Sequence, residues 1–327
     1  MHLVSAADNF QRRHSWVGFP LAVLYKYLDD QAGFLAALIT YYGFLSLFPA
    51  LLLLVTTLGY VLAGDPEAQQ QVLDSALGQF PVIGTQLEQN LSSLQGSPVA
   101  VSVGALGLLY GALGIGQAAQ LAFNGAWAVP RNERPDPIRS RMRSLLFVLL
   151  IGAGLVVTTI LTALGAATGT LDAHIGSLIR LLVLLAAAAT NVALFAAAFR
   201  LLTARDVAAG DLLPGAVFAA FGWQVLQTLG TTYVSRILAR STDIYGVFGI
   251  VLGLFAWIYL GATVTVLAAE VNVVRACQLW PRSLLAPFTD GRPLTSADKR
   301  AYASYAEMRR HKRLEKIDVS FDYPQPP

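Results

Sequence analysis

The chain of 327 residues is 55% hydrophobic and only 13% charged, with a mean hydropathy of +0.55. Soluble domains carry about 25% charged residues, so this composition excludes a water-soluble globule and predicts a polytopic membrane protein. The net charge of +3 and the pI near 9.0 do not indicate a nucleic-acid partner, because the basic residues sort by side of the membrane.

The predicted N-terminal segment spans residues 1–33 and is polar up to about residue 14. It lacks the apolar core and small-residue cleavage site of a secretory signal peptide, so we expect the first span to be retained. From Ser15 onward, apolar residues recur at near-helical spacing with Lys26, Asp29 and Asp30 among them. This pattern predicts either an interfacial helix along the membrane surface or a helix packed on the bundle.

The first predicted span covers about residues 34–63 and contains the run TYYGFLSLFP. Pro49 has no backbone N–H to donate, so it is expected to kink this helix. The hydroxyls of Tyr41, Tyr42 and Ser46 lie in the same helix. They would either line a polar cleft or hydrogen-bond to neighbouring spans.

Residues 64–97 form the long loop after this span and contain four acidic residues but no Lys or Arg. Apolar residues follow helical spacing on both sides of Pro81 and Gly84, which predicts a short amphipathic helical hairpin. Because the loop lacks basic residues, we expect it on the outer side of the membrane.

Five further apolar stretches are long enough to cross a hydrocarbon core of about 30 Å, which takes about 20 helical residues. The second span carries Gly107 and Gly111, a GxxxG spacing that predicts close helix packing. Asn191 and Gln224 lie within the fourth and fifth spans, where each would make an interhelical hydrogen bond or line a polar path. The predicted spans are 98–123, 145–167, 178–199, 212–234 and 245–272.

The last span, YGVFGIVLGLFAWIYLGATVTVLAAEVN, has no charged side chain until Glu270 and is followed closely by Asn272. An ionisable residue within a span is a candidate functional group, and here both polar residues are candidates for a lipid or ion path. The alternative is that Glu270 anchors the helix end at the membrane interface, with Arg275 nearby.

The distribution of Lys and Arg predicts the orientation of the six spans. Of the 23 basic residues, 20 fall on the side of the two termini and 3 on the other side. By the positive-inside rule, both termini face the cytoplasm of a bacterial inner membrane. The sequence thus predicts an all-α polytopic bundle of six transmembrane helices over residues 34–274, with the amphipathic hairpin outside.

Residues 275–327 form a predicted cytoplasmic basic tail. Thr295 or Ser296 is placed to cap a basic helix that runs through KRAYASYAEMRRHKRLEKI. A cluster of basic residues beside a membrane attracts anionic headgroups. The candidate anionic-lipid contacts are Arg309, Arg310, Lys312 and Arg313.

A search for enzyme chemistry finds no catalytic set. The four histidines lie in termini or loops without metal-ligand spacing, and no phosphate-binding glycine loop is present. The single cysteine, Cys277, excludes an intramolecular disulfide and a cysteine-rich metal site. We therefore expect no catalytic residue, no metal and no cofactor.

Three segments together resemble the YihY/BrkB family of bacterial inner-membrane proteins, once labelled ribonuclease BN. They are ALITYYGFLSLFPALLLLV, DLLPGAVFAAFGWQVLQ and the last span, and the resemblance covers about residues 15–275. It implies a six-span protein of the cytoplasmic membrane, with links to envelope integrity, serum resistance and lipid or lipopolysaccharide traffic. The ribonuclease label disagrees with the lack of metal ligands in this sequence.

Two classes of function remain. In the first, the kinked first span, Glu270, Asn272 and the outer hairpin form a gated cleft that handles a lipid or another amphipathic envelope component. In the second, the bundle is a non-transporting scaffold that recruits an envelope-assembly protein partner. Membrane lipids are the expected partners in the first case, and no nucleic acid is expected in either.

Overall fold

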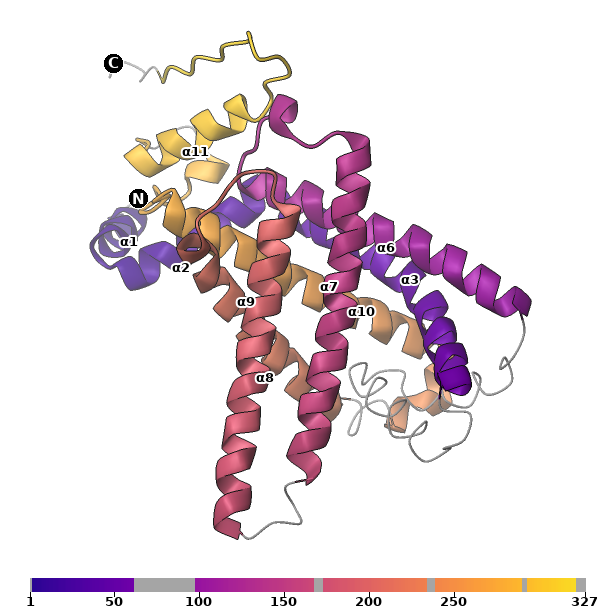
Figure 1. Cartoon of the computed structure of the whole chain (residues 1–327). Helices are drawn as coiled ribbons and strands as arrows, with labels where there is room; N and C mark the ends of the chain where they lie inside the picture. The colour runs from indigo at the N-terminus through magenta and orange to yellow at the C-terminus, as the bar shows by residue number, and fades with distance from the viewer. Residues whose placement is uncertain (1, 62–97, 168–172, 234–238, 290–292, 322–327) are drawn as a thin grey trace.

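The structure is a computed structural model that describes residues 2–61, 98–167, 173–233, 239–289 and 293–321. Within these ranges the chain is all-helical and contains no strand (Figure 1). Two short 3-10 helices, Arg131–Glu133 and Ala286–Phe288, accompany the α-helices. The α-helices are α1 His2–Arg13, α2 Ser15–Asp29, α3 Ala32–Val61, α6 Pro98–Ala126, α7 Pro137–Ala167, α8 Ala173–Leu202, α9 Ala209–Tyr233, α10 Ala239–Ala276 and α11 Ser296–Glu307.

Five of these helices are long and apolar enough to cross a membrane: α6, α7, α8, α9 and α10. They correspond to the second to sixth predicted spans. The described apolar stretch of α3, Ala32–Leu47, is shorter, so the count of six is not confirmed. The predicted outer hairpin at 64–97 lies outside the described residues.

Small residues set the distance between α3 and α6. A Cβ added at Gly111 would lie 2.5 Å from the Cβ of Ser46 and 2.8 Å from its Cα. A Cβ added at Gly107 would lie 2.8 Å from Cγ of Pro49. The GxxxG pair therefore lets the two helices pack closely, as its spacing predicts.

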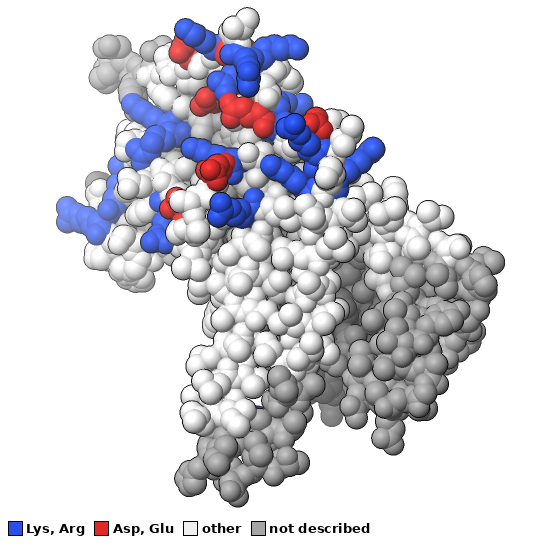
Figure 2. Space-filling model, in the orientation of Figure 1, with Lys and Arg blue, Asp and Glu red and all other residues white. Residues whose placement is uncertain are grey.

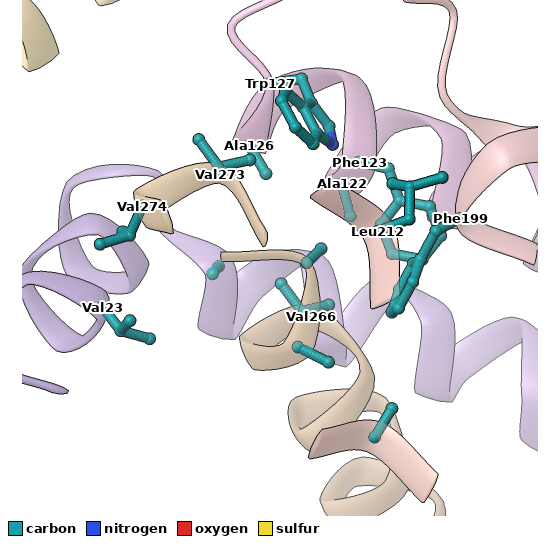
Figure 3. Close-up of a cluster of buried hydrophobic side chains, with 14 of the residues drawn as sticks. Val23, Ala122, Phe123, Ala126, Trp127, Phe199, Leu212, Val266, Val273 and Val274 are labelled. Carbon is teal, nitrogen blue, oxygen red and sulfur yellow. The ribbon is translucent and has the colours of Figure 1, made fainter. Parts of the chain in front are cut away.

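The hydrophobic core lies where α2, α6, α9 and α10 meet (Figure 3). Alanines make up much of it, so the helices approach closely around a few larger side chains. The rings of Phe123 and Phe199 meet edge to face with centroids 5.1 Å apart, which ties α6 to α8. By contrast, α7 and α8 run as a long hairpin whose apolar side chains are mostly exposed, as expected for helices facing lipid (Figure 1).

Charged side chains gather at one end of the molecule. On the face seen in Figure 2, the Lys, Arg, Asp and Glu side chains cluster at the end that carries α1, α2 and α11, and the described surface below them is uncharged. The two ends of the described chain also lie at this end (Figure 1).

The helix α11 begins as predicted and ends earlier. Thr295 is its N-cap and forms a capping box with Asp298: the Thr295 hydroxyl accepts from the Asp298 N–H, and the carboxylate accepts from the Thr295 N–H. The helix stops at Glu307, so the prediction that it continues through the basic run beyond was wrong. That run, RRHKR, places five cationic or titratable side chains next to one another, and their mutual repulsion disfavours another helical turn.

Candidate functional site

A buried cluster of charges joins α2 to the C-terminal end of α10. Within SWVGFPLAVLYKYLD, Lys26 shares the buried face of α2 with Ala22 and Val23, so its side chain is only 1% exposed. Its ammonium pairs with the carboxylate of Asp30 one turn later and lies 3.7 Å from Oε2 of Glu270, which is also 1% exposed.

The cluster holds two carboxylates against one ammonium. Oε2 of Glu270 accepts no hydrogen bond from any described residue, and burial raises the pKa of Asp30 above its ordinary value in spite of the neighbouring Lys26. Arg275 is exposed and forms no ion pair with Glu270 in the described structure. The ionic partner of Glu270 is therefore Lys26 of a different helix and not Arg275.

A second buried ionic group fixes the C-terminal segment. Arg282 is fully buried, and its Nε donates to Oδ1 of Asp298 at 2.6 Å while its Nη1 donates to Oδ2 of Asp29 at 3.0 Å. Burial alone would lower the pKa of Arg282, but Asp298 and Asp29 raise it above its ordinary value. Tyr305 lies between this ionic group and the Lys26 cluster, because the centroid of its ring is 5.0 Å from the Lys26 ammonium.

Asn272 links α10 to α9 through a side-chain hydrogen bond. Its side chain is fully buried, and Oδ1 accepts a hydrogen bond of 2.6 Å from the N–H of Gly215. A Cβ at Gly215 would lie 2.1 Å from the carbonyl oxygen of Ala268, so the two helices touch through backbone here. This geometry agrees better with helix docking than with a ligand path.

A lateral cavity of about 350 Å³ opens between α3, α6 and the start of α7. Several of its polar groups are already engaged: Nε2 of Gln120 donates to the Ser140 carbonyl at 2.9 Å, and Oδ1 of Asn124 accepts from the Ala204 N–H at 2.7 Å. Its lining residues are Leu38, Tyr42, Gln117, Ala118, Gln120, Leu121, Asn124, Arg134, Pro135 and Ser140.

Arg134 gives this cavity a positive rim. Its Nε donates to the Val129 carbonyl at 3.2 Å, and no carboxylate of the described residues forms an ion pair with it. Burial and the nearby Arg131 and Arg309 lower its pKa, which means that the guanidinium lies among like charges. An anionic group entering the cavity would relieve that repulsion.

Among the predicted cleft residues, only Tyr42 lines this cavity. Its ring packs on Gly114 of α6 and on Tyr110, with centroids 6.2 Å apart. Ser46 and Pro49 pack against the glycines of α6 and do not line the cavity, and Tyr41 is 52% exposed. Two further predicted residues, Asn191 and Gln224, line neither this cavity nor the second one, which lies beside α11.

The predicted anionic-lipid contacts divide into two kinds. Arg310 is engaged within the protein: it pairs with Glu133 and lies 3.8 Å from Glu307. Exposed side chains beyond the end of α11 make up the rest of the set, namely Arg309, Lys312 and Arg313.

Comparison with known proteins places this architecture in a family. The sequence model described as Virulence factor BrkB matches residues 23–284, which is most of the chain. The chain belongs to this family. The resemblance found in the three apolar segments is thus confirmed, and the match covers every helix from the middle of α2 to α10.

Relatives in the BrkB family are distant in sequence. The chain is 26% identical to the ribonuclease-like protein YfkH of Bacillus subtilis over 73% of this chain and 88% of that protein. It is 25% identical to the inner membrane protein YhjD of Escherichia coli over 82% of this chain and 79% of that one. A UPF0761 membrane protein of Pseudomonas aeruginosa is 28% identical over 82% of this chain and 66% of its own length.

No solved structure gave a significant match. The membrane names of these BrkB relatives and the apolar helices together make the chain a multi-pass inner-membrane protein. Within the described residues, no group of three or more His, Cys, Asp or Glu side chains is placed to hold a metal ion.

The sequence interpretation missed the partners of Glu270 and the role of Arg282. Lys26 and Asp30 have the i,i+4 spacing of a helical ion pair, which could have indicated their contact. They were instead interpreted as polar residues of an interfacial or packed helix, without a partner in the last span. Arg282 lies 253 residues from Asp29 in sequence, and no local pattern indicates such a contact.

Proposed function

We propose that this BrkB-family protein accommodates the headgroup of a lipid, or of another amphipathic envelope component, in the lateral cavity and moves it within the membrane without enzymatic chemistry. The observation that carries the proposal is the cavity itself. It combines an uncompensated cation at its rim with polar side chains inside, and it lies beside helices that are exposed and apolar.

The size of the cavity supports this assignment. A volume of about 350 Å³ is at the small end of ligand pockets, which suits a headgroup but not acyl chains. Exposed apolar side chains lie on the same helices, with Leu121 44% exposed and Tyr110 60% exposed on α6. Acyl chains would stay on this outer surface while the headgroup enters between α3 and α7.

The orientation belongs to the same proposal. The positive-inside rule, applied to the charged end of the molecule, supports a cytoplasmic position for both termini and for the cavity rim. The lipid would then enter from the inner leaflet. An anionic headgroup is favoured by Arg134 and by the surrounding arginines, Arg131 and Arg309.

Reconstitution in vesicles tests the proposal. We expect wild-type protein to speed the exchange between leaflets of a fluorescent anionic phospholipid, followed by quenching the dye with a membrane-impermeant reductant. Arg134→Gln should slow this exchange about tenfold to a hundredfold, because a charge-assisted contact contributes about 1.5–3 kcal/mol. Arg139→Gln is the matched control, since the Arg139 side chain is 80% exposed and does not line the cavity.

Equal exchange by wild type, both variants and empty vesicles would overturn the proposal and favour the alternative, a non-transporting scaffold for an envelope-assembly protein. That alternative has its own support in the α7–α8 hairpin, where only 6% of an 18-residue apolar part of α8 is buried within the chain. An apolar surface of this kind suits either lipid or a partner helix.

A further inference from the structure

A second cavity lies at the charged end, where α6 and α10 end and α11 crosses over them. Its volume is about 360 Å³. Lys26 lies in its wall, and Trp127, Val129 and Leu279 give it an apolar side. The remaining lining residues are Ala126, Ala128, Pro130, Glu133, Arg205, Val273, Cys277, Arg300, Ser304 and Glu307.

The chain turns sharply at the two helix ends that frame this cavity. Ala128 after α6 and Gln278 after α10 both have left-handed backbone, with φ of 50° and 51°. The N–H of Val129 then donates to the Asn124 carbonyl and that of Leu279 to the Val274 carbonyl, each at 2.8 to 2.9 Å. Both turns are therefore closed by hydrogen bonds and form a preformed wall.

Two arginines in the wall of this cavity have no ion-pair partner among the described residues. Its two acids, Glu133 and Glu307, both face Arg310, which forms ion pairs with each of them. Lys26 likewise has two carboxylates beside it, those of Asp30 and Glu270. Neither Arg205 nor Arg300 forms an ion pair with a carboxylate in the described part of the chain; Arg300 only donates to the Gln278 carbonyl.

We propose that this cavity binds a phosphate group in its dianionic form. Two guanidinium groups without carboxylate partners match two negative charges, and the planar fork of Arg presents paired N–H donors to phosphate oxygens. The Ser304 hydroxyl, also in the wall, is available as a further donor after its present bond to the Ala301 carbonyl is exchanged. The apolar side faces the remainder of a phosphomonoester.

The site goes beyond the proposed lipid cavity and does not depend on it. Arg300 and Ser304 belong to α11, which lies outside the residues matched by the family model. The helix is held in place by the buried pair of Arg282 and Asp298, so the C-terminal segment completes a pocket that the family-matched part leaves open. Phosphate in the cavity would bridge Arg300 of α11 to Arg205, which precedes α9.

The chain contains its own reporter for this site. Cys277 lines the cavity and is the single cysteine in the sequence. Its labelling by a maleimide in the purified full-length protein should therefore slow when phosphate occupies the cavity. Burial raises the pKa of the Cys277 thiol, so labelling is best followed near pH 8.5, where more thiolate is present.

Three probes are compared at constant ionic strength: inorganic phosphate, a soluble alkyl phosphomonoester, and phosphatidic acid in mixed micelles. We expect concentration-dependent protection, with the half-protecting concentration raised about tenfold or more by Arg205→Gln and by Arg300→Gln. Arg139→Gln, at an arginine that is 80% exposed and outside the cavity, should leave it unchanged. Comparing half-protecting concentrations removes any effect of the variants on the intrinsic labelling rate.

Protection by the soluble probes would assign the site to a free anion, and protection by phosphatidic acid alone would assign it to a lipid headgroup. Either result supports the phosphate site. Absence of protection by all three probes would overturn it, as would equal protection by chloride or unchanged half-protecting concentrations in both Arg variants. Since Arg205 is exposed, its variant is expected to fold, which keeps the test decisive if Arg300→Gln does not.

Discussion

At the scale of single residues, we expect Lys26 to contribute more to the stability of the fold than Glu270. Lys26 is the one cation among two carboxylates, and its pair with Asp30 is the closer one. Removing one partner of a buried ionic group leaves an uncompensated charge, which is costly, whereas neutralising a surplus charge is not. The two residues therefore differ in what their substitution should do.

We expect Lys26→Met to destabilise the protein by about 3–5 kcal/mol, because it leaves Asp30 and Glu270 without a cation. Glu270→Gln should cost about 1 kcal/mol or less, since Oε2 of Glu270 accepts no hydrogen bond from the described residues and the Lys26–Asp30 pair remains. Thermal unfolding in detergent measures both. A loss for Glu270→Gln as large as that for Lys26→Met would show that the acid is needed for folding.

A normally stable Glu270→Gln protein also separates structure from function at this position. If the variant folds at wild-type abundance yet loses lipid exchange in vesicles, the charge of Glu270 takes part in the activity. Full exchange at matched abundance would end the functional interpretation of this residue.

At the scale of elements, the contact between α3 and α6 depends on the absence of side chains. Gly111 meets the Cα and Cβ of Ser46, so an added methyl group would meet backbone that cannot rotate away. In a membrane, close backbone approach is itself a main source of helix association. The polar cavity lies on the same pair of helices, so its shape depends on this contact.

Gly111→Ala should destabilise the protein by about 1–3 kcal/mol through overpacking. Gly152→Ala in α7 is the matched control, because a Cβ there meets nothing within 4 Å, and alanine in a helix interior should be neutral or stabilising by about 0.5–1 kcal/mol. The two variants are compared by thermal unfolding in the same detergent. Equal midpoints would show that α3 shifts freely and that the glycine contact is not tight.

At the scale of the whole molecule, charge separates along one direction. The described charged side chains visible in Figure 2 gather at the end carrying α1, α2 and α11, and the α7–α8 hairpin extends away from it with a mostly apolar surface. This separation is what a bilayer imposes, because an apolar surface without charges suits only the hydrocarbon region.

Cysteine accessibility in intact cells tests the orientation. In a Cys277→Ser background, we expect a cysteine at Lys312 to react only with reagents that enter the cytoplasm. Cysteines at positions 86 and 89, in the loop that lacks basic residues, should react from outside. Labelling of both regions from the same side would contradict the cytoplasmic placement of the termini.

Most of the fold could be predicted from the sequence, because apolar runs of sufficient length have few alternatives in a membrane. Five predicted spans match α6 to α10, and the GxxxG of Gly107 and Gly111 packs as expected. The α7 helix begins at Pro137, eight residues before the predicted span at 145, since charged residues can extend a helix into water where hydropathy no longer marks it.

The candidate site was harder to predict. Glu270 and Asn272 are polar residues in an apolar run, and both are buried, but their partners come from Lys26 and Gly215 in distant helices. Likewise, Tyr42 was identified by its hydroxyl, whereas Arg134 lies in a connecting loop where an arginine carries no pattern. Long-range pairs of this kind follow from tertiary packing and leave no local periodicity.

The ion pair between Asp29 and the fully buried Arg282 also sets an order of events during synthesis. The two residues are separated by 253 positions, so the acid of α2 is made long before its arginine exists. At about 5–20 residues per second, the ribosome takes roughly 13 to 50 s to supply it. During that interval the transmembrane helices are synthesised while Asp29 has no arginine partner. The ion pair at the charged end can form only after the segment that contains Arg282 has been made.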